Sequence, residues 1–168
     1  DVDKTYGALM NKFKWGNFDK QKLFVDHSYA PSVQGLRMMM MRLASLYEAR
    51  GDKEKAAAVA LRYFESFPNM NFQYDLRVMP FIQSLVSAGK LDDAKKHLRI
   101  LATETADMMN FYNSLSAEEL KSSFQQEKAY ANSSVREIIL RSSEFQDPEF
   151  EKEMKELLSK YDLAPVNN

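Results

Sequence analysis

A short stretch near the start of the chain, residues 12–22, interleaves four lysines with three aromatic side chains. The aromatic residues are Phe13, Trp15 and Phe18, and Trp15 is the only tryptophan. Aromatic rings beside cations are typical of sugar contacts and of the interfacial belt of membranes. The stretch therefore predicts a glycan or membrane-interface contact through these three residues. The alternative interpretation is that the rings pack inside the protein while the lysines face water.

Four consecutive methionines, Met38 to Met41, form the second unusual group. Successive positions of a helix point in different directions, so four methionines in a row cannot all pack against one neighbour. Some of these side chains must therefore be exposed or line a groove. Methionine is flexible and polarizable, which suits surfaces that bind peptides.

Other reactive side chains do not form a recognisable catalytic or metal centre. His27 and His97 are the only histidines and there is no cysteine, so no zinc-ligand pattern exists. The acidic pairs Asp92-Asp93 and Glu118-Glu119 fall in the first turns of expected helices, where negative charge is favourable. Gly89-Lys90 is not followed by serine or threonine, as a phosphate-binding loop requires. We therefore predict a non-catalytic domain with no cofactor and no bound metal.

The elements that carry these residues are indicated by a sequence phrase that occurs twice. Each copy ends a helix with glycine, turns, and begins another helix with a small alanine. Gly51 and Ala56 in the first copy lie 38 positions before Gly89 and Ala94 in the second. Glycine ends helices because it readily adopts the left-handed conformation. The repeat therefore predicts two helical hairpins.

The first hairpin resembles a tetratricopeptide repeat. The large, small, aromatic, glycine, alanine and proline positions of that family fall on Leu43, Ala44, Tyr47, Gly51, Ala56 and Pro68. The second copy is degenerate, because Ile82 replaces the small residue and no proline closes it. Since a tetratricopeptide unit has 34 residues, the longer spacing implies an inserted linker at residues 69–73.

We accordingly predict an all-α fold, a tetratricopeptide-like right-handed stack of helical hairpins with extra capping helices at both ends. The expected single domain, residues 1–168, divides into an N-terminal helix and connection (1–34), two hairpins (35–68 and 74–113) and C-terminal helices (116–161). Ser116 and Glu119 predict a capping box before a long helix towards Phe145. Asp147-Pro148 predicts the start of the last helix.

In a tetratricopeptide arrangement the first helix of each hairpin lines the concave surface. The predicted groove residues are Met38, Met41, Ser45 and Glu48 from the first hairpin and Leu76, Met79, Gln83 and Val86 from the second. Terminal helices could fill this groove instead. Pro80 either kinks the second hairpin or marks its start, and a start there would remove Leu76 and Met79 from the groove.

Charge and hydropathy argue against nucleic acid as a partner and against a membrane-spanning helix. The 23 basic and 24 acidic residues leave a net charge of −1, so the chain has no overall field for nucleic acid. Its apolar runs are far shorter than a membrane-spanning helix requires. The chain begins at Asp1 without an initiator methionine or signal pattern. We therefore expect a soluble piece of a longer protein.

Three phrases of the sequence carry a second resemblance. They are residues 1–7, Phe13-Lys14-Trp15-Gly16, and residues 78–82 before Ala88-Gly89. Together they resemble the C-terminal region of large multi-pass membrane proteins of the Bacteroidetes, a family of unknown function similar to protein O-mannosyltransferases. The resemblance implies a membrane-embedded glycosyltransferase-like part before Asp1, which would hold the catalytic acid, and an extracytoplasmic, periplasmic location for this domain.

Three functional hypotheses follow. The leading one is a non-catalytic protein-interaction domain that binds a polypeptide, either a glycosylation acceptor or a partner subunit, along the methionine-lined groove. The second is a domain that contributes to glycosyl transfer by holding a glycan or lipid-linked sugar through Phe13, Trp15 and Phe18, which requires Trp15 to be open to solvent. The third is a structural cap for the membrane part.

Overall fold

The computed structural model describes residues 1–162, apart from the side chain of His27, and this part of the chain is all-α without a β-strand. The helices are α1 (Val2–Asn11), α2 (Ala30–Ala49), α3 (Lys53–Ser66), α4 (Met79–Ser87), α5 (Leu91–Ser114), α6 (Ala117–Glu119), α7 (Gln125–Ser142) and α8 (Pro148–Leu158). The predicted all-α class is confirmed.

The chain forms two compact units, and their boundary lies inside the long helix α5. Unit 1 comprises Asp1–Ala94 and unit 2 begins at Lys95. The sequence prediction treated residues 1–168 as a single domain and gave no sign of this division. A continuous amphipathic helix carries no composition change at the point where its packing partners change, so the boundary has no local signature.

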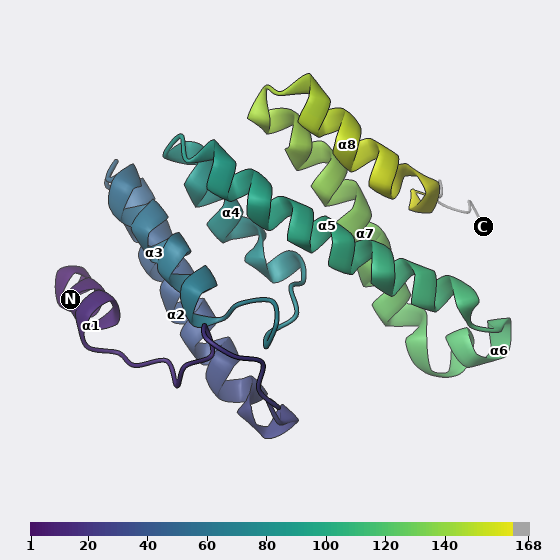
Figure 1. Ribbon diagram of the computed structural model, residues 1–168, viewed down its shortest axis with the longest axis horizontal. Helices are drawn as coiled ribbons and strands as arrows, with labels where there is room; N and C mark the ends of the chain where they lie inside the picture. Colours follow the sequence, from purple (N-terminus) through teal and green to yellow (C-terminus); the bar gives the residue numbers. More distant parts are fainter. Residues whose placement is uncertain (163–168) are drawn as a thin grey trace. The chain divides into compact units, whose positions relative to one another are not determined.

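In unit 1, α2 and α3 form the predicted first hairpin and lie side by side, as Figure 1 shows. Helix α4 packs against both of them, and α1 packs against α2 and α3. The core of this unit is rich in aromatic rings. Tyr63 of α3 stacks on Phe81 of α4, with ring centroids 4.1 Å apart. Ala56 and Ala60 are completely buried, which lets neighbouring helices approach closely.

The two copies of the repeated phrase fold into the same turn. The glycines have φ values of +78° at Gly51 and +74° at Gly89. In the first copy the amide of Asp52 donates to the carbonyl of Tyr47, and in the second Lys90 donates to Leu85, both at 2.9 Å. These bonds satisfy carbonyl groups that the helix ends leave open. The turns also touch, because Lys90 Nζ lies 3.1 Å from a carboxylate oxygen of Glu54.

The expected linker at residues 69–73 connects α3 to α4 and holds the N-terminal loop. The side-chain amide of Asn71 donates to the carbonyls of Phe18 (2.7 Å) and Gln21 (2.9 Å), and its oxygen accepts from the amide of Leu23 at 2.7 Å. Phe72 packs edge-on against Phe18, with centroids 4.9 Å apart. One asparagine therefore fixes a loop some fifty residues earlier in the chain.

Pro80 marks the start of a helix. Helix α4 begins at Met79 and has Pro80 in its first turn. Amide groups of a first turn have no acceptor within the helix, so the N–H that proline lacks costs no helical hydrogen bond. A separate 3₁₀ turn, Leu76–Val78, precedes it. Leu76 therefore lies outside α4, and Met79 is buried. The alternative in which Pro80 kinks a longer helix is wrong.

Unit 2 contains the capping box and the last helix as predicted. The hydroxyl of Ser116 accepts from the amide of Glu119, and the Glu119 carboxylate accepts from the Ser116 amide. Asp147 caps α8 by accepting from two amides of its first turn. The chain is helical from Ala117 towards Phe145, but not as one regular α-helix, because a π-helical segment, Leu120–Phe124, lies between α6 and α7. Such π-helical turns are rare within α-helices.

Candidate functional site

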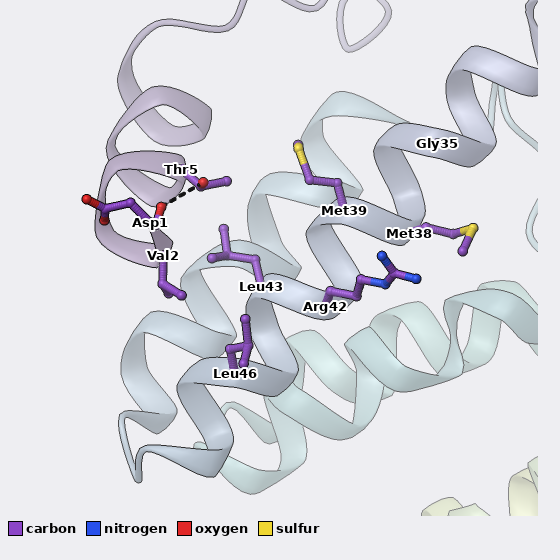
Figure 2. A pocket seen from close by; sticks show the side chains of 9 residues that line it. All are labelled: Asp1, Val2, Thr5, Gly35, Met38, Met39, Arg42, Leu43 and Leu46. Carbon is purple, nitrogen blue, oxygen red and sulfur yellow. Dashed lines mark hydrogen bonds between the residues drawn. The ribbon is translucent and has the colours of Figure 1, made fainter.

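A hollow of about 460 Å³ lies where α1 meets the exposed face of α2. Figure 2 shows the side chains that line it, and Met38 and Arg42 extend from α2 on the side away from α1. The lining residues are Asp1, Val2, Thr5, Gly35, Met38, Met39, Arg42, Leu43 and Leu46. The side chains of Met38 and Leu46 remain 44% and 46% exposed, so this apolar surface is open to a partner.

A second hollow of about 360 Å³ follows on the same helix, lined by Met41, Arg42, Ser45 and Leu46. Arg42 and Leu46 line both hollows, so the two form one continuous surface along α2. Arg42 is exposed and takes part in no ion pair among the described residues. We call Met38, Met41, Arg42, Ser45 and Leu46 the α2 surface.

The structure brings three of the predicted groove residues to this surface. Met38, Met41 and Ser45 line it, while Glu48 is half-buried one turn further along α2 and lines neither hollow. The second-hairpin residues line neither hollow: Met79 is buried, and Leu76, Gln83 and Val86 are half-buried.

Sequence reasoning missed the contribution of α1 and the role of Arg42. The apolar face of the first helix can be recognised in the sequence, but the neighbouring residues do not indicate which helix this face packs against. Arg42 lies one position after the methionine run and could have been noticed as a charge in an otherwise apolar stripe.

The lysine and aromatic stretch borders a third hollow, of about 740 Å³, with Phe13, Lys14, Trp15 and Arg62 in its lining. Trp15 is half-buried, packed edge-on against Phe67 at 5.3 Å with the Arg62 guanidinium 5.9 Å from its ring. Its indole N–H is buried without a hydrogen-bond partner in the described structure. The four lysines are exposed, Phe13 is 40% exposed, and Phe18 is half-buried.

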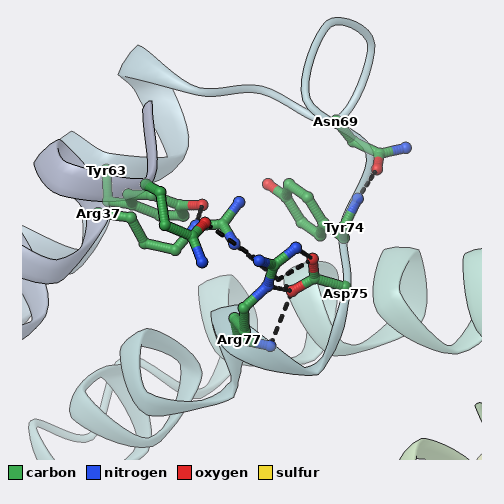
Figure 3. A network of polar contacts seen from close by, with 7 residues as sticks. Arg37, Tyr63, Asn69, Tyr74, Asp75 and Arg77 are labelled. Carbon is green, nitrogen blue, oxygen red and sulfur yellow. Dashed lines mark hydrogen bonds and ion pairs between the residues drawn. The ribbon is translucent and has the colours of Figure 1, made fainter. Parts of the chain in front are cut away.

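A polar network joins α2, α3 and the segment before α4 (Figure 3). The buried Arg37 donates from Nε to the Tyr63 hydroxyl at 2.9 Å, and its Nη1 lies 3.5 Å from Asp75 Oδ1. The Arg77 guanidinium also donates to the Asp75 carboxylate and forms an ion pair with it. Its Nη1 donates to Gln34 Oε1 at 3.0 Å. Burial raises the pKa of Tyr63, so its hydroxyl remains neutral as an acceptor. This network links α2 and α3 to the 3₁₀ turn that precedes α4.

The described residues contain no group of three or more His, Cys, Asp or Glu side chains that could hold a metal ion. His97 is buried, and this burial, with the neighbouring charge of Lys96, lowers its pKa to about 4. Hydrogen bonds from Lys95 and from the first turn of α8 lower the pKa of Asp147. Burial explains the pKa shift of His97, and the lysine partner with the helix cap explains the pKa shift of Asp147.

No family model, curated protein or solved structure matches this chain. None of the described helices is long and apolar enough to cross a membrane.

Proposed function

We propose that this chain is a tetratricopeptide-like helical-repeat domain that binds a polypeptide on the α2 surface. The observation that carries the proposal is the pair of adjoining apolar hollows, with exposed Met38 and Leu46, on the first helix of the first hairpin. The identical turns at Gly51 and Gly89 support the repeat.

The chemistry of this surface specifies the partner. Apolar hollows lined by flexible methionines accept side chains of several shapes. Arg42, unpaired between the two hollows, favours a carboxylate nearby on the partner. The expected ligand is therefore a polypeptide segment that presents apolar side chains on one face together with an aspartate or glutamate, as an amphipathic helix does.

The test uses a phage-displayed library of random peptides, from which binders to the whole chain are selected and their dissociation constants measured. We expect selected peptides to combine apolar residues with an acidic one. Arg42→Glu and Leu46→Asp should each weaken binding by about tenfold or more. Lys53→Glu makes the same charge change at an exposed residue outside the hollows and should leave binding unchanged. Peptides that bind both Arg42→Glu and Leu46→Asp like the unaltered chain would overturn the proposal.

We place this domain, by the resemblance of its three phrases, at the C-terminus of a membrane-embedded glycosyltransferase-like protein, on the extracytoplasmic face. The bound polypeptide would then be an acceptor protein or a partner subunit. Protease added to intact cells with a permeabilised outer membrane should cleave the domain from the full-length protein. Protection of the domain until the inner membrane is lysed would contradict this location.

A second candidate function is supported by the hollow beside Trp15. Its partly exposed aromatic rings, with polar Asn17 and Asp19 in the lining, could hold a glycan. Acrylamide quenching of Trp15 fluorescence tests this candidate, with mannose oligosaccharides as probes. Protection by sugar would favour glycan binding, whereas a signal indifferent to every sugar would exclude it.

A further inference from the structure

The tip of unit 2 carries an aromatic hollow that the proposed polypeptide site on α2 does not use. Its volume is about 280 Å³, just below the range of pockets for drug-sized molecules. The lining residues are Met108, Tyr112, Gln126, Glu127, Tyr130 and Ala131. They come from the C-terminal half of α5 and the first turns of α7, and Ala131 is buried while Tyr130 is 45% exposed. This hollow is large enough to take one long side chain.

The π-helical segment Leu120–Phe124 builds one wall of this tip. It carries Phe124 back against α5, where its ring centroid lies 5.6 Å from Phe111 and 6.1 Å from Tyr112. Phe111 itself remains 49% exposed. Wide helical turns of this kind often occur where a side chain must be placed for function. The aromatic surface is therefore larger than the hollow and continues towards solvent.

The charge at the hollow is a single carboxylate. Glu127 is exposed in the first turn of α7 and forms no ion pair among the described residues. Most acidic residues of α7 and α8 behave differently: Glu137, Glu151 and Glu153, for example, each pair with a lysine or arginine. Glu127 and Tyr112 line the same hollow, and burial, followed by the charge of Glu127, raises the pKa of Tyr112. A cation in the hollow would meet both groups.

We infer that this hollow binds a lysine side chain of a partner polypeptide. Aromatic faces attract cations, and an unpaired carboxylate adds charge complementarity. The lining also offers hydrogen-bond acceptors on Tyr112, Gln126 and Glu127, which suit the three N–H donors of a primary ammonium group. A quaternary ammonium group has no such donors and could not use them.

An NMR titration of the whole chain with n-butylammonium chloride, which reproduces the end of a lysine side chain, tests this inference. We expect saturable shifts in the amide signals of residues 108–131. The neutral analogue 1-butanol should not produce them, and sodium chloride controls for ionic strength. Glu127→Gln and Tyr130→Leu should each weaken butylammonium binding by roughly 2- to 5-fold. Glu118→Gln, an exposed acid outside the lining, should not weaken it.

Three results would overturn the inference. One is an equal effect of 1-butanol and butylammonium, which would make the hollow merely apolar. Another is tighter binding of choline than of butylammonium, which would indicate a quaternary ammonium ligand instead of lysine. The third is unchanged butylammonium binding in Glu127→Gln. None of these results bears on the α2 surface, because its residues lie in unit 1 and its test uses different variants.

Discussion

Arg37 is a permanent charge that the fold keeps almost entirely from water. It is tolerated because Tyr63 and Asp75 supply a hydrogen bond and an opposite charge within 3.5 Å. Removing one partner of a buried ion pair destabilises the fold, because the remaining charge stays buried without an opposite charge beside it. Here Arg77 still compensates Asp75, which moderates the effect.

We therefore expect Arg37→Met to lower the free energy of unfolding by about 2–4 kcal/mol. Urea unfolding followed by Trp15 fluorescence measures this change. Lys4→Met is the control, since Lys4 pairs with Asp1 at the exposed surface, where such pairs contribute less than about 1 kcal/mol. Equal losses in the two variants would show that the Arg37 network does not stabilise the fold.

His97 makes stability depend on pH. The unfolded chain takes up a proton at this residue below pH 6.5, whereas burial lowers the folded pKa to about 4. The unfolded state therefore binds more protons between these values, and the free energy of unfolding falls as the pH is lowered through that window. The loss amounts to about 3 kcal/mol at most. In His97→Gln, unfolding measured from pH 7 to pH 4 should lose this part of the slope, and an unchanged slope would contradict the assignment.

Single residues with local partners could be predicted from the sequence. The Ser116–Glu119 capping box and the Asp147 cap were found because each pairs with amides within three positions along the chain. Arg37 and Asn71 were not found, because their partners lie 26 to 53 positions away in sequence. Hydrophobic periodicity indicates local structure and does not specify which residues far apart in the sequence form contacts.

At the scale of elements, the two glycine turns should respond alike to substitution. Alanine at Gly51 or Gly89 would have to adopt a left-handed conformation, so each change should cost about 1 kcal/mol. Gly7 is the matched control. It lies within α1, and a Cβ there would meet no atom within 4 Å.

Gly7→Ala should therefore stabilise the protein by roughly 0.5–1 kcal/mol, because alanine is the better helix former. Thermal unfolding of the three variants measures these effects. If Gly51→Ala and Gly89→Ala differed in sign, the two turns would not be equivalent.

The elements themselves were largely predictable, because hydrophobic periodicity and turn residues are local. The run of α5 to Ser114 and the first hairpin follow from such signals. The π-helical segment Leu120–Phe124 could not be predicted from such signals, since it contains no helix-breaking glycine or proline. The candidate site was predicted only in part, because α1 joins α2 through contacts that its own sequence does not specify.

At the scale of the whole molecule, α5 crosses the boundary between the two units as one helix. Helices form cooperatively, so disruption on one side of the boundary should be felt on the other. We expect Ile138→Ala, which truncates a buried side chain of unit 2, to shift the Trp15 fluorescence transition of unit 1 together with the far-UV circular dichroism transition. The expected loss is roughly 2–5 kcal/mol.

Arg37→Met provides the reciprocal measurement from unit 1. If the fluorescence and circular dichroism transitions separated in either variant, the units would unfold independently. The division into two units itself could not be predicted, because the helix that carries the boundary looks uniform in sequence.

The methionines of α2 also make the α2 surface sensitive to oxidants. The chain has no cysteine, so its ten methionines contain all of its sulfur. Met38 is 44% exposed and would react readily, whereas Met40 is completely buried. Conversion of Met38 to the sulfoxide would place a polar group in an apolar hollow without removing a core side chain. Oxidative damage should therefore abolish peptide recognition while the molecule stays folded, and methionine sulfoxide reductase should restore it.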